Sequence, residues 1–471
     1  MSTETKVFRE PSGKKFLGHP VGLYLLFFTE LWERFSYYGM RAILILYLTK
    51  SYLEGGLGFD ESYAGLLYGW FTGLVYFTPL IGGWLADKYL GHRKAITIGG
   101  CTMFLGQMVL FLVASKAGLY AGLLLLIIGN GFFKPNISTM VGGLYKPGDA
   151  KRDSAFSIFY MGINVGAFFA PFVVGLMANT WFADVDSTTG KILRHAYNYG
   201  FLAAAVGMLI GQILFNTLSN KLLGDLGVEP VGDKKEEEAI RELDNVATQK
   251  TPLTKEEKQR TIAIFVYFFF AIFFFAGFEQ AGSSFTLYTE KFIDRSVGDF
   301  MIPTEWFQSI NPLFIVLLTP VFAMFWPSKL GQKVSTPVKM GMGLVLLGIG
   351  FLFMLGATFQ RGGDVADTTI KASIFWMIFT YFLHTVGELC LSPVGLSTVT
   401  KLAPPKLASL LMGVWLLSSF FGNLIAGQVS SATSSLGAGS VYQVLAVAAI
   451  AFGVALLCLN KVLLKMMHGV R

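Results

Sequence analysis

Twelve apolar stretches of membrane-spanning length constrain this chain more than any other feature of its sequence. The first six are Val21–Tyr52, Ser62–Leu85, Ala95–Ser115, Gly118–Met140, Ser154–Ala178 and Ala196–Leu218. The last six are Thr261–Leu287, Thr304–Trp326, Val338–Thr358, Ala372–Val399, Leu407–Ala432 and Val441–Leu464. About 20 apolar residues in a helix cross the hydrocarbon core, where a segment must satisfy its own backbone hydrogen bonds. The sequence therefore predicts an all-α membrane protein with twelve transmembrane helices.

A polar segment divides these stretches into two groups of six. Residues 219–260 are rich in Lys and Glu, so we expect a solvated cytoplasmic linker there. It would join an N-terminal six-helix bundle at 21–218 to a C-terminal six-helix bundle at 261–464. Residues 1–20 and 465–471 would be a cytoplasmic N-terminal segment and a cytoplasmic tail. Only 14% of the residues are charged, whereas soluble domains carry about 25%, which excludes a soluble protein.

The distribution of Lys and Arg predicts the orientation. With both termini inside, the inner segments hold eighteen of these residues and the outer loops hold eight, the charge-balanced linker being left out. Cytoplasmic loops carry such an excess, so we predict that both termini are cytoplasmic. The net charge of +7 then reflects topology and not a nucleic-acid partner. Residues 1–20 show no apolar core with a cleavage site, so we expect no removable signal peptide.

Few ionisable groups remain at depth in the membrane. They are Glu30, Glu33, Arg34, Arg41, Lys134, Glu279, His384 and Glu388. A charge near the bilayer centre costs several kcal/mol unless it faces a counter-charge or a wet cavity. We therefore expect these groups to line a polar pathway, the alternative for any one of them being an ion pair that packs helices. The three cysteines lie in apolar stretches without metal-ligand spacing, so we expect neither a disulfide nor a metal site.

Counting residues from the helix ends matches some of these charges in depth. At about 1.5 Å per residue, Glu30 and Lys134 both lie about 12 Å from the cytoplasmic edge, which allows them to meet. Arg41 and Glu279 reach a similar level near the outer side and can pair. Glu388 lies close to mid-membrane, where the second half would offer an anion to the cations of the first half.

Helical spacing places several side chains on shared faces. Arg34 lies four residues after Glu30 and four before Tyr38, and His384 lies four before Glu388. Tyr37, Tyr38 and Tyr76 add hydroxyl groups, although packing explains these tyrosines equally well. A single histidine on an apolar face is more often a hydrogen-bonded packing residue.

The connection between the second and third stretches reads Gly82-Gly83-Trp84-Leu85-Ala86-Asp87-Lys88 followed by Gly91-His92-Arg93-Lys94. It resembles the loop signature of the major facilitator superfamily, in which an aspartate and basic residues latch neighbouring helix ends. A charged turn on the cytoplasmic side is the alternative. The glycines favour the latch, because closely approaching helix ends need small residues.

Three further motifs resemble the proton-dependent oligopeptide transporter family over nearly the whole chain. They are Glu30-x-x-Glu33-Arg34-Phe35-Ser36-Tyr37-Tyr38-Gly39-Met40-Arg41, Phe159-Tyr160-x-x-Ile163-Asn164-x-Gly166 and Gly387-Glu388-Leu389-Cys390-Leu391-Ser392-Pro393. The resemblance implies a major facilitator fold and a proton symporter of dipeptides and tripeptides. Its two bundles would rock about a central site.

The resemblance also implies a substrate site made of Arg34, Tyr38, Tyr76, Lys134, Asn164, Asn311, Glu388 and Ser392. Arg34, Lys134 and Asn164 would hold the carboxyl end and backbone of the peptide, and Asn311 and Glu388 would receive its amino end. The chemistry agrees, because a zwitterion needs fixed charges of opposite sign with tolerant apolar walls between them.

Proton coupling is assigned by the same resemblance to Glu30, Glu33 and Glu279. Arg41 with Glu279 resembles the outer gate of the family. Phe275 and Trp415 could supply apolar walls of the cavity.

Three other functions compete with peptide symport. A nitrate or other small-anion carrier of the same family would have no use for an amine-binding Glu388, and a drug/proton antiporter would not need Arg34 and Lys134. A sensor would carry an added signalling domain. We see no arrangement of catalytic residues typical of an enzyme. We expect a multi-pass protein of the bacterial inner membrane whose partners are small peptides, protons and the lipid bilayer, with no cofactor and no obligate protein partner.

Overall fold

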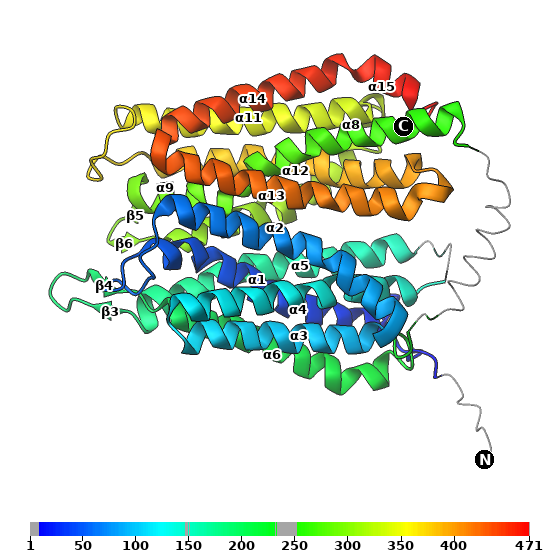
Figure 1. The fold of residues 1–471 in the computed structure, drawn as a ribbon, viewed down its shortest axis with the longest axis horizontal. Coiled ribbons are helices and arrows are strands. Elements are labelled where there is room, and N and C mark those ends of the chain that lie inside the picture. Colours follow the sequence, from blue (N-terminus) through cyan, green and yellow to red (C-terminus); the bar gives the residue numbers. More distant parts are fainter. Residues whose placement is uncertain (1–8, 147–148, 150, 231, 233–251, 471) are drawn as a thin grey trace. The chain divides into compact units, whose positions relative to one another are not determined.

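The computed structural model describes residues 9–146, 149, 151–230, 232 and 252–470 (Figure 1). In this part of the chain, eleven helices are long and apolar enough to cross a membrane. Strands occur as short pieces outside the long helices, at β1 (Lys15–Phe16), β2 (His19–Pro20), β3 (Asp184–Val185), β4 (Ile192–Arg194), β5 (Ser296–Val297) and β6 (Phe300–Met301). The prediction of a helical protein with many membrane spans is therefore confirmed.

The first helix, α1 (Val21–Thr49), is not among these eleven because charges interrupt its apolar sequence. Its 29 residues correspond to about 43 Å at 1.5 Å per residue, which is enough to cross a bilayer. A twelfth crossing thus depends on whether other helices shield the charges of α1.

The chain forms two compact units, and the boundary between them cuts through two helices. Unit 1 comprises Met1–Met40, Phe77–Asp184 and Ala196–Thr248, and unit 2 comprises Arg41–Tyr76, Val185–His195 and Gln249–Arg471. The helix α1 therefore begins in unit 1 and ends in unit 2. The helix α2 (Glu61–Leu85) begins in unit 2 and ends in unit 1. The division into bundles at 219–260 stays a prediction, and the charged residues 234–238 of that linker lie outside the described residues.

Unit 1 is a set of packed long helices. Its further elements are the π-helical turns η1 (Ala86–Leu90) and η2 (Met177–Trp181) and the helices α3 (His92–Leu112), α4 (Lys116–Gly143), α5 (Lys151–Leu176) and α6 (Tyr197–Leu222). α3 packs against both α4 and α6, and α5 contacts α6.

The connection from α2 to α3 brings backbone groups close together, as its glycines predict. A Cβ atom at Gly82 would lie 2.0 Å from the carbonyl oxygen of Gly131 on α4, so only glycine fits there. The Arg93 guanidinium is buried and donates to the carbonyl oxygens of Leu226 and Gly224, each at 2.7 Å. These bonds fix the start of α3 against the segment that follows α6.

Unit 2 holds the remaining helices. The long ones are α8 (Lys255–Phe278), α10 (Ile310–Phe325), α11 (Thr336–Gln360), α12 (Ile374–Leu402), α13 (Ala408–Leu436) and α14 (Ala438–Cys458). The short ones are η3 (Glu279–Gly282), α9 (Ser284–Phe292), η4 (Thr304–Ser309), η5 (Gly331–Lys333), η6 (Pro405–Leu407) and α15 (Asn460–Met466). α11 packs against α12 and α14 (Figure 1), over a core rich in phenylalanine and tyrosine.

The seventh apolar stretch, predicted over Thr261–Leu287, is not one continuous α-helix. The α-helix ends at Phe278, and the 3₁₀ turn η3 begins at Glu279. The side-chain amide of Gln280 donates to the carbonyl oxygens of Ala276 and Ala426, at 3.0 and 3.1 Å. In this turn, hydrogen bonds from a polar side chain thus take the place of regular α-helical backbone hydrogen bonds. The apolar pattern of the stretch does not predict this change.

Candidate functional site

A buried charged cluster lies on α1 in unit 1. Glu30, Glu33 and Arg34 are each at most 2% exposed. The Arg34 guanidinium donates twice to the Glu33 carboxylate, with Nη2 2.6 Å from Oε1, and its Nε lies 3.3 Å from Glu30 Oε1. Arg34 Nη2 also donates to Asn130 Oδ1 on α4 at 3.2 Å. The predicted contact of Arg34 with Glu30 is present, and Glu33 binds the guanidinium more closely.

Lys134 is the second cation near this cluster. It is half-buried on α4, and it attracts the Glu30 carboxylate electrostatically. Sequence reasoning missed Asn130, although it lies one helical turn before Lys134 and so on the same face. The carboxylates of Glu30 and Glu33 thus balance the positive charges of Arg34 and Lys134.

Other predicted residues of unit 1 surround Arg34. Its guanidinium carbon lies 5.2 Å from the centroid of the Tyr37 ring, and Tyr38 interacts with it electrostatically. Asn164 is 5% exposed on α5 and donates to the Tyr160 carbonyl oxygen at 3.0 Å. Two residues later, a Cβ atom at Gly166 would lie 2.3 Å from the carbonyl oxygen of Leu31. This close approach brings α5, with Asn164, up against α1.

Unit 2 contains a different polar group around Glu388. Asn311, in the first turn of α10, donates from Nδ2 to Glu388 Oε2 and to Thr385 Oγ1, both at 3.0 Å. Glu388 is half-buried on α12, and its hydrogen-bond partner is neutral. Ser392 lies one turn further along α12, and its buried hydroxyl has no hydrogen-bond partner among the described residues. Thr385 is the member that the sequence did not single out.

Three further predicted residues of unit 2 are His384, Trp415 and Phe275, and they pack in its apolar interior. His384 is 3% exposed, and its Nε2 lies 3.1 Å from the carbonyl oxygen of Leu347, which favours a packing role. Trp415 belongs to the core of unit 2 and is 5% exposed, and Phe275 packs against that core. Tyr76 is the last residue of the first segment of unit 2, on α2.

The predicted pair of Arg41 and Glu279 is present in unit 2. The guanidinium of Arg41 donates to the Glu279 carboxylate and to the Tyr68 hydroxyl, the latter at 2.7 Å, and the pair is almost fully buried. Tyr68 was not predicted. Glu279 follows directly after the end of α8, so the break in that helix positions the acid.

Further ion pairs follow towards the C-terminal ends of α1 and α9. Glu290 accepts from Lys50 at 3.0 Å and from Arg295 at 3.1 Å, and Lys291 pairs with Glu61. These contacts join segments from both halves of the sequence within unit 2. The role of Arg41 and Glu279 as a gate stays a prediction.

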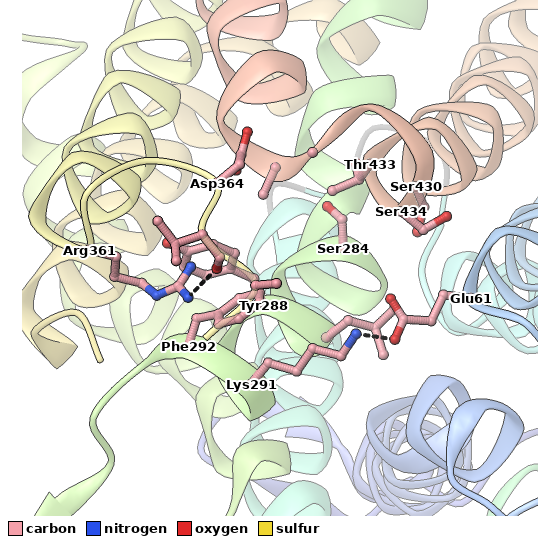
Figure 2. A pocket seen from close by; sticks show the side chains of 15 residues that line it. Glu61, Ser284, Tyr288, Lys291, Phe292, Arg361, Asp364, Ser430, Thr433 and Ser434 are labelled. Atoms are coloured by element: carbon pink, nitrogen blue, oxygen red, sulfur yellow. Dashed lines mark hydrogen bonds and ion pairs between the residues drawn. The ribbon is translucent and has the colours of Figure 1, made fainter. Parts of the chain in front are cut away.

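A cavity of about 180 Å³ lies beside the pair of Lys291 and Glu61. Figure 2 shows their side chains pointing toward each other, with Ser284, Ser430 and Ser434 at the same cavity. Its lining, within the described residues, includes none of the residues that the sequence predicts for substrate or proton binding. The candidate functional groups are therefore the polar group around Arg34 in unit 1 and the polar group around Glu388 in unit 2, each described within its own unit, and not this cavity.

Comparisons with known proteins agree with the motifs. The model of the POT family matches residues 93–221 and 232–445. The chain is 37% identical to an uncharacterized transporter of Bacillus subtilis, covering 97% of each chain. It is 33% identical to a di-/tripeptide transporter of Lactococcus lactis subsp. cremoris, covering 97% of this chain and 98% of the relative.

A solved structure gives the same result for the fold. A peptide transporter POT variant crystallised with sulfate is 34% identical, with a TM-score of 0.86 over 97% of this chain and 98% of that one. The chain is thus a multi-pass integral membrane protein with the major facilitator fold, and it is not an enzyme. It belongs to the POT family of proton-dependent oligopeptide transporters.

Proposed function

We propose that this protein is a proton-coupled symporter that imports dipeptides and tripeptides by alternating access. The observation that supports this proposal most is the separation of charge between the two units. Unit 1 carries Arg34 and Lys134, which can bind a carboxylate, and unit 2 carries Glu388, which can bind an ammonium group. A peptide zwitterion has both groups, whereas a small inorganic anion has no use for Glu388.

Charge balance around Arg34 supports proton coupling. Glu30, Glu33, Arg34 and Lys134 sum to zero when all four are ionised. A substrate carboxylate that binds Arg34 adds a negative charge and competes with Glu33 for the guanidinium, which favours proton uptake by one of the two glutamates. One proton restores neutrality in a site where an unpaired charge is costly. Loading with peptide and loading with a proton would therefore occur together.

The gating proposal concerns Arg41 and Glu279 in unit 2. Their buried pair would help to hold the outer side closed, and protonation of Glu279 would weaken that hold. The topology that we propose has twelve transmembrane helices in two six-helix bundles, with both termini in the cytoplasm of a bacterial cell.

Uptake of dialanine into proteoliposomes tests the proposal. An imposed inward proton gradient should drive accumulation of dialanine, and a proton ionophore should abolish it. Nitrate and a cationic dye serve as competing substrates for the alternative functions. Accumulation of nitrate but not of dialanine would refute peptide symport.

A further inference from the structure

A second cavity of unit 2 lies where three helices end. It has a volume of about 630 Å³ and is lined in part by Trp326, Lys333, Lys339 and Asn460. These residues come from the connection between α10 and α11, from the first turns of α11, and from the start of α15. Volumes of about 300–1,000 Å³ are usual for small-molecule sites, so this cavity has room for a head group.

The cavity lies beside the ends of helices that are long and apolar enough to cross a membrane. α10 ends at Phe325, α11 begins at Thr336 and α14 ends at Cys458, and all three meet the criteria for a membrane span. Trp326 follows α10 directly, and tryptophan is enriched at the height of the lipid head groups. A ligand in this cavity would thus lie beside the head groups of the surrounding bilayer.

The charge of the cavity is entirely positive. Among the described residues that line it, two are lysines and none is acidic. Neither Lys333 nor Lys339 has a carboxylate within ion-pair distance in the part of the chain that the structure describes. Lys401, from α12, lies close enough to repel Lys339. The site therefore has unneutralised positive charge that an anion would stabilise.

Local contacts position the polar side chains that line this cavity. The Lys339 ammonium lies 4.5 Å from the centroid of the Trp326 ring, a distance typical of a cation–π contact. Ser335 directly precedes α11, but its hydroxyl donates to Asn460 Oδ1 at 2.7 Å and makes no capping bond. In the first turn of α11, Thr336 and Val338 add backbone N–H groups beside the two lysines, whereas Pro337 has none.

We propose that this cavity binds the phosphate group of an anionic phospholipid, with Lys333 and Lys339 as its cationic ligands. Basic pockets between membrane helices commonly bind such head groups. The proposal is independent of the peptide-transport assignment, since it needs only a protein embedded in a bilayer. Inorganic phosphate shares the same chemistry and serves as a separate arm of the test.

Lipid retention by the purified full-length protein tests this site. The protein is equilibrated with equal amounts of phosphatidylglycerol and phosphatidylcholine in detergent, and bound lipid is counted by native mass spectrometry. We expect phosphatidylglycerol to be preferred, and we expect K333Q/K339Q to lower that preference about tenfold. The matched control K461Q/K465Q removes the same charge from exposed positions on α15 and should leave the preference unchanged.

Three other results would overturn the proposal. They are an equal loss in K461Q/K465Q, no loss in K333Q/K339Q, and displacement of the bound lipid by millimolar inorganic phosphate alone. K333R/K339R keeps both charges and should retain the preference. If K333Q/K339Q does not fold, the single variant K333Q, which alters an exposed side chain, should still lower the preference severalfold.

Discussion

The polar groups around Arg34 and Glu388 differ in how the protein stabilises a charge inside the membrane. Arg34 is 2% exposed and is already bound by Glu33, Glu30 and Asn130. Glu388 is half-buried and accepts from the neutral amide of Asn311.

Under the proposed function, this difference predicts different tasks for the two groups. A ligand can reach Glu388 without breaking an ion pair, which suits simple recognition of an ammonium group. A ligand of Arg34 must replace a carboxylate of the protein, and that exchange can be tied to a proton. Substitutions should therefore affect recognition in unit 2, but coupling as well as recognition in unit 1.

Removing Arg34 should have the largest effect. Arg34→Ala leaves Glu30 and Glu33 buried without their closest cation, and breaking a buried pair costs about 3–5 kcal/mol. We expect dialanine uptake to fall more than 100-fold, and Lys134→Ala to abolish uptake as well. Initial rates in proteoliposomes measure this.

Arg152→Ala, which removes an exposed arginine from unit 1, is the matched control and should transport normally. Near-normal uptake by Arg34→Ala would remove this residue from the substrate site.

Neutralising the acids of the same cluster should separate coupling from binding. With Glu30→Gln or Glu33→Gln, peptide binding no longer needs a proton to restore charge balance, so gradient-driven accumulation should be lost. Exchange of labelled for unlabelled dialanine should stay within a few-fold of the unaltered rate. If both variants still concentrate peptide in response to a proton gradient, coupling lies elsewhere in the molecule.

Glu388→Gln should weaken recognition without removing a partner from an ion pair. A hydrogen bond to a charged group contributes about 1.5–3 kcal/mol, so we expect affinity for dialanine to fall about 10- to 100-fold. Competition at fixed pH measures this, with Glu256→Gln as an exposed control.

The same assay tests the amino end of the peptide. N-acetyl-dialanine should compete poorly against the unaltered protein, because it lacks the ammonium group. Equal competition by the acetylated and free dipeptides would exclude an amine-binding role for Glu388 and favour an anion carrier.

The smallest effect should come from the pair of Arg41 and Glu279, the proposed gate. Ser62 and Ser431, on α2 and α13, have hydroxyl oxygens 2.5 Å apart, so cysteines at these positions should form a disulfide. At fixed pH, Glu279→Gln should slow disulfide formation a few-fold if the pair helps to keep these segments together. Low pH slows thiol chemistry in both proteins, so it should slow the reaction by a larger factor with Glu279 present than in Glu279→Gln.

The disulfide assay needs a background in which Cys101, Cys390 and Cys458 are replaced. An unchanged rate in Glu279→Gln, together with an equal effect of pH on both proteins, would argue against a gate at Arg41 and Glu279.

Several features of this protein could be predicted from the sequence because they depend on local composition. Apolar stretches gave the helical class, and depth counting gave the pair of Arg41 and Glu279. Asn130 and Thr385 were missed because neutral polar residues cost little in a helix and do not stand out. The break of α8 before Glu279 was missed because the residues before it are uniformly apolar, and the polar residues after it were read as part of the same stretch.

The sequence by itself determined that the chain spans a membrane, which charges lie at depth and which family it belongs to. These follow from hydropathy, from the spacing of residues along a helix and from motifs. Only the tertiary structure decided which carboxylate holds Arg34 and that the His384 ring lies buried against the carbonyl oxygen of Leu347. It also placed two lysines around a cavity that no acid lines among the described residues. These outcomes depend on which helix faces meet, and helix packing brings together side chains that are far apart in the chain.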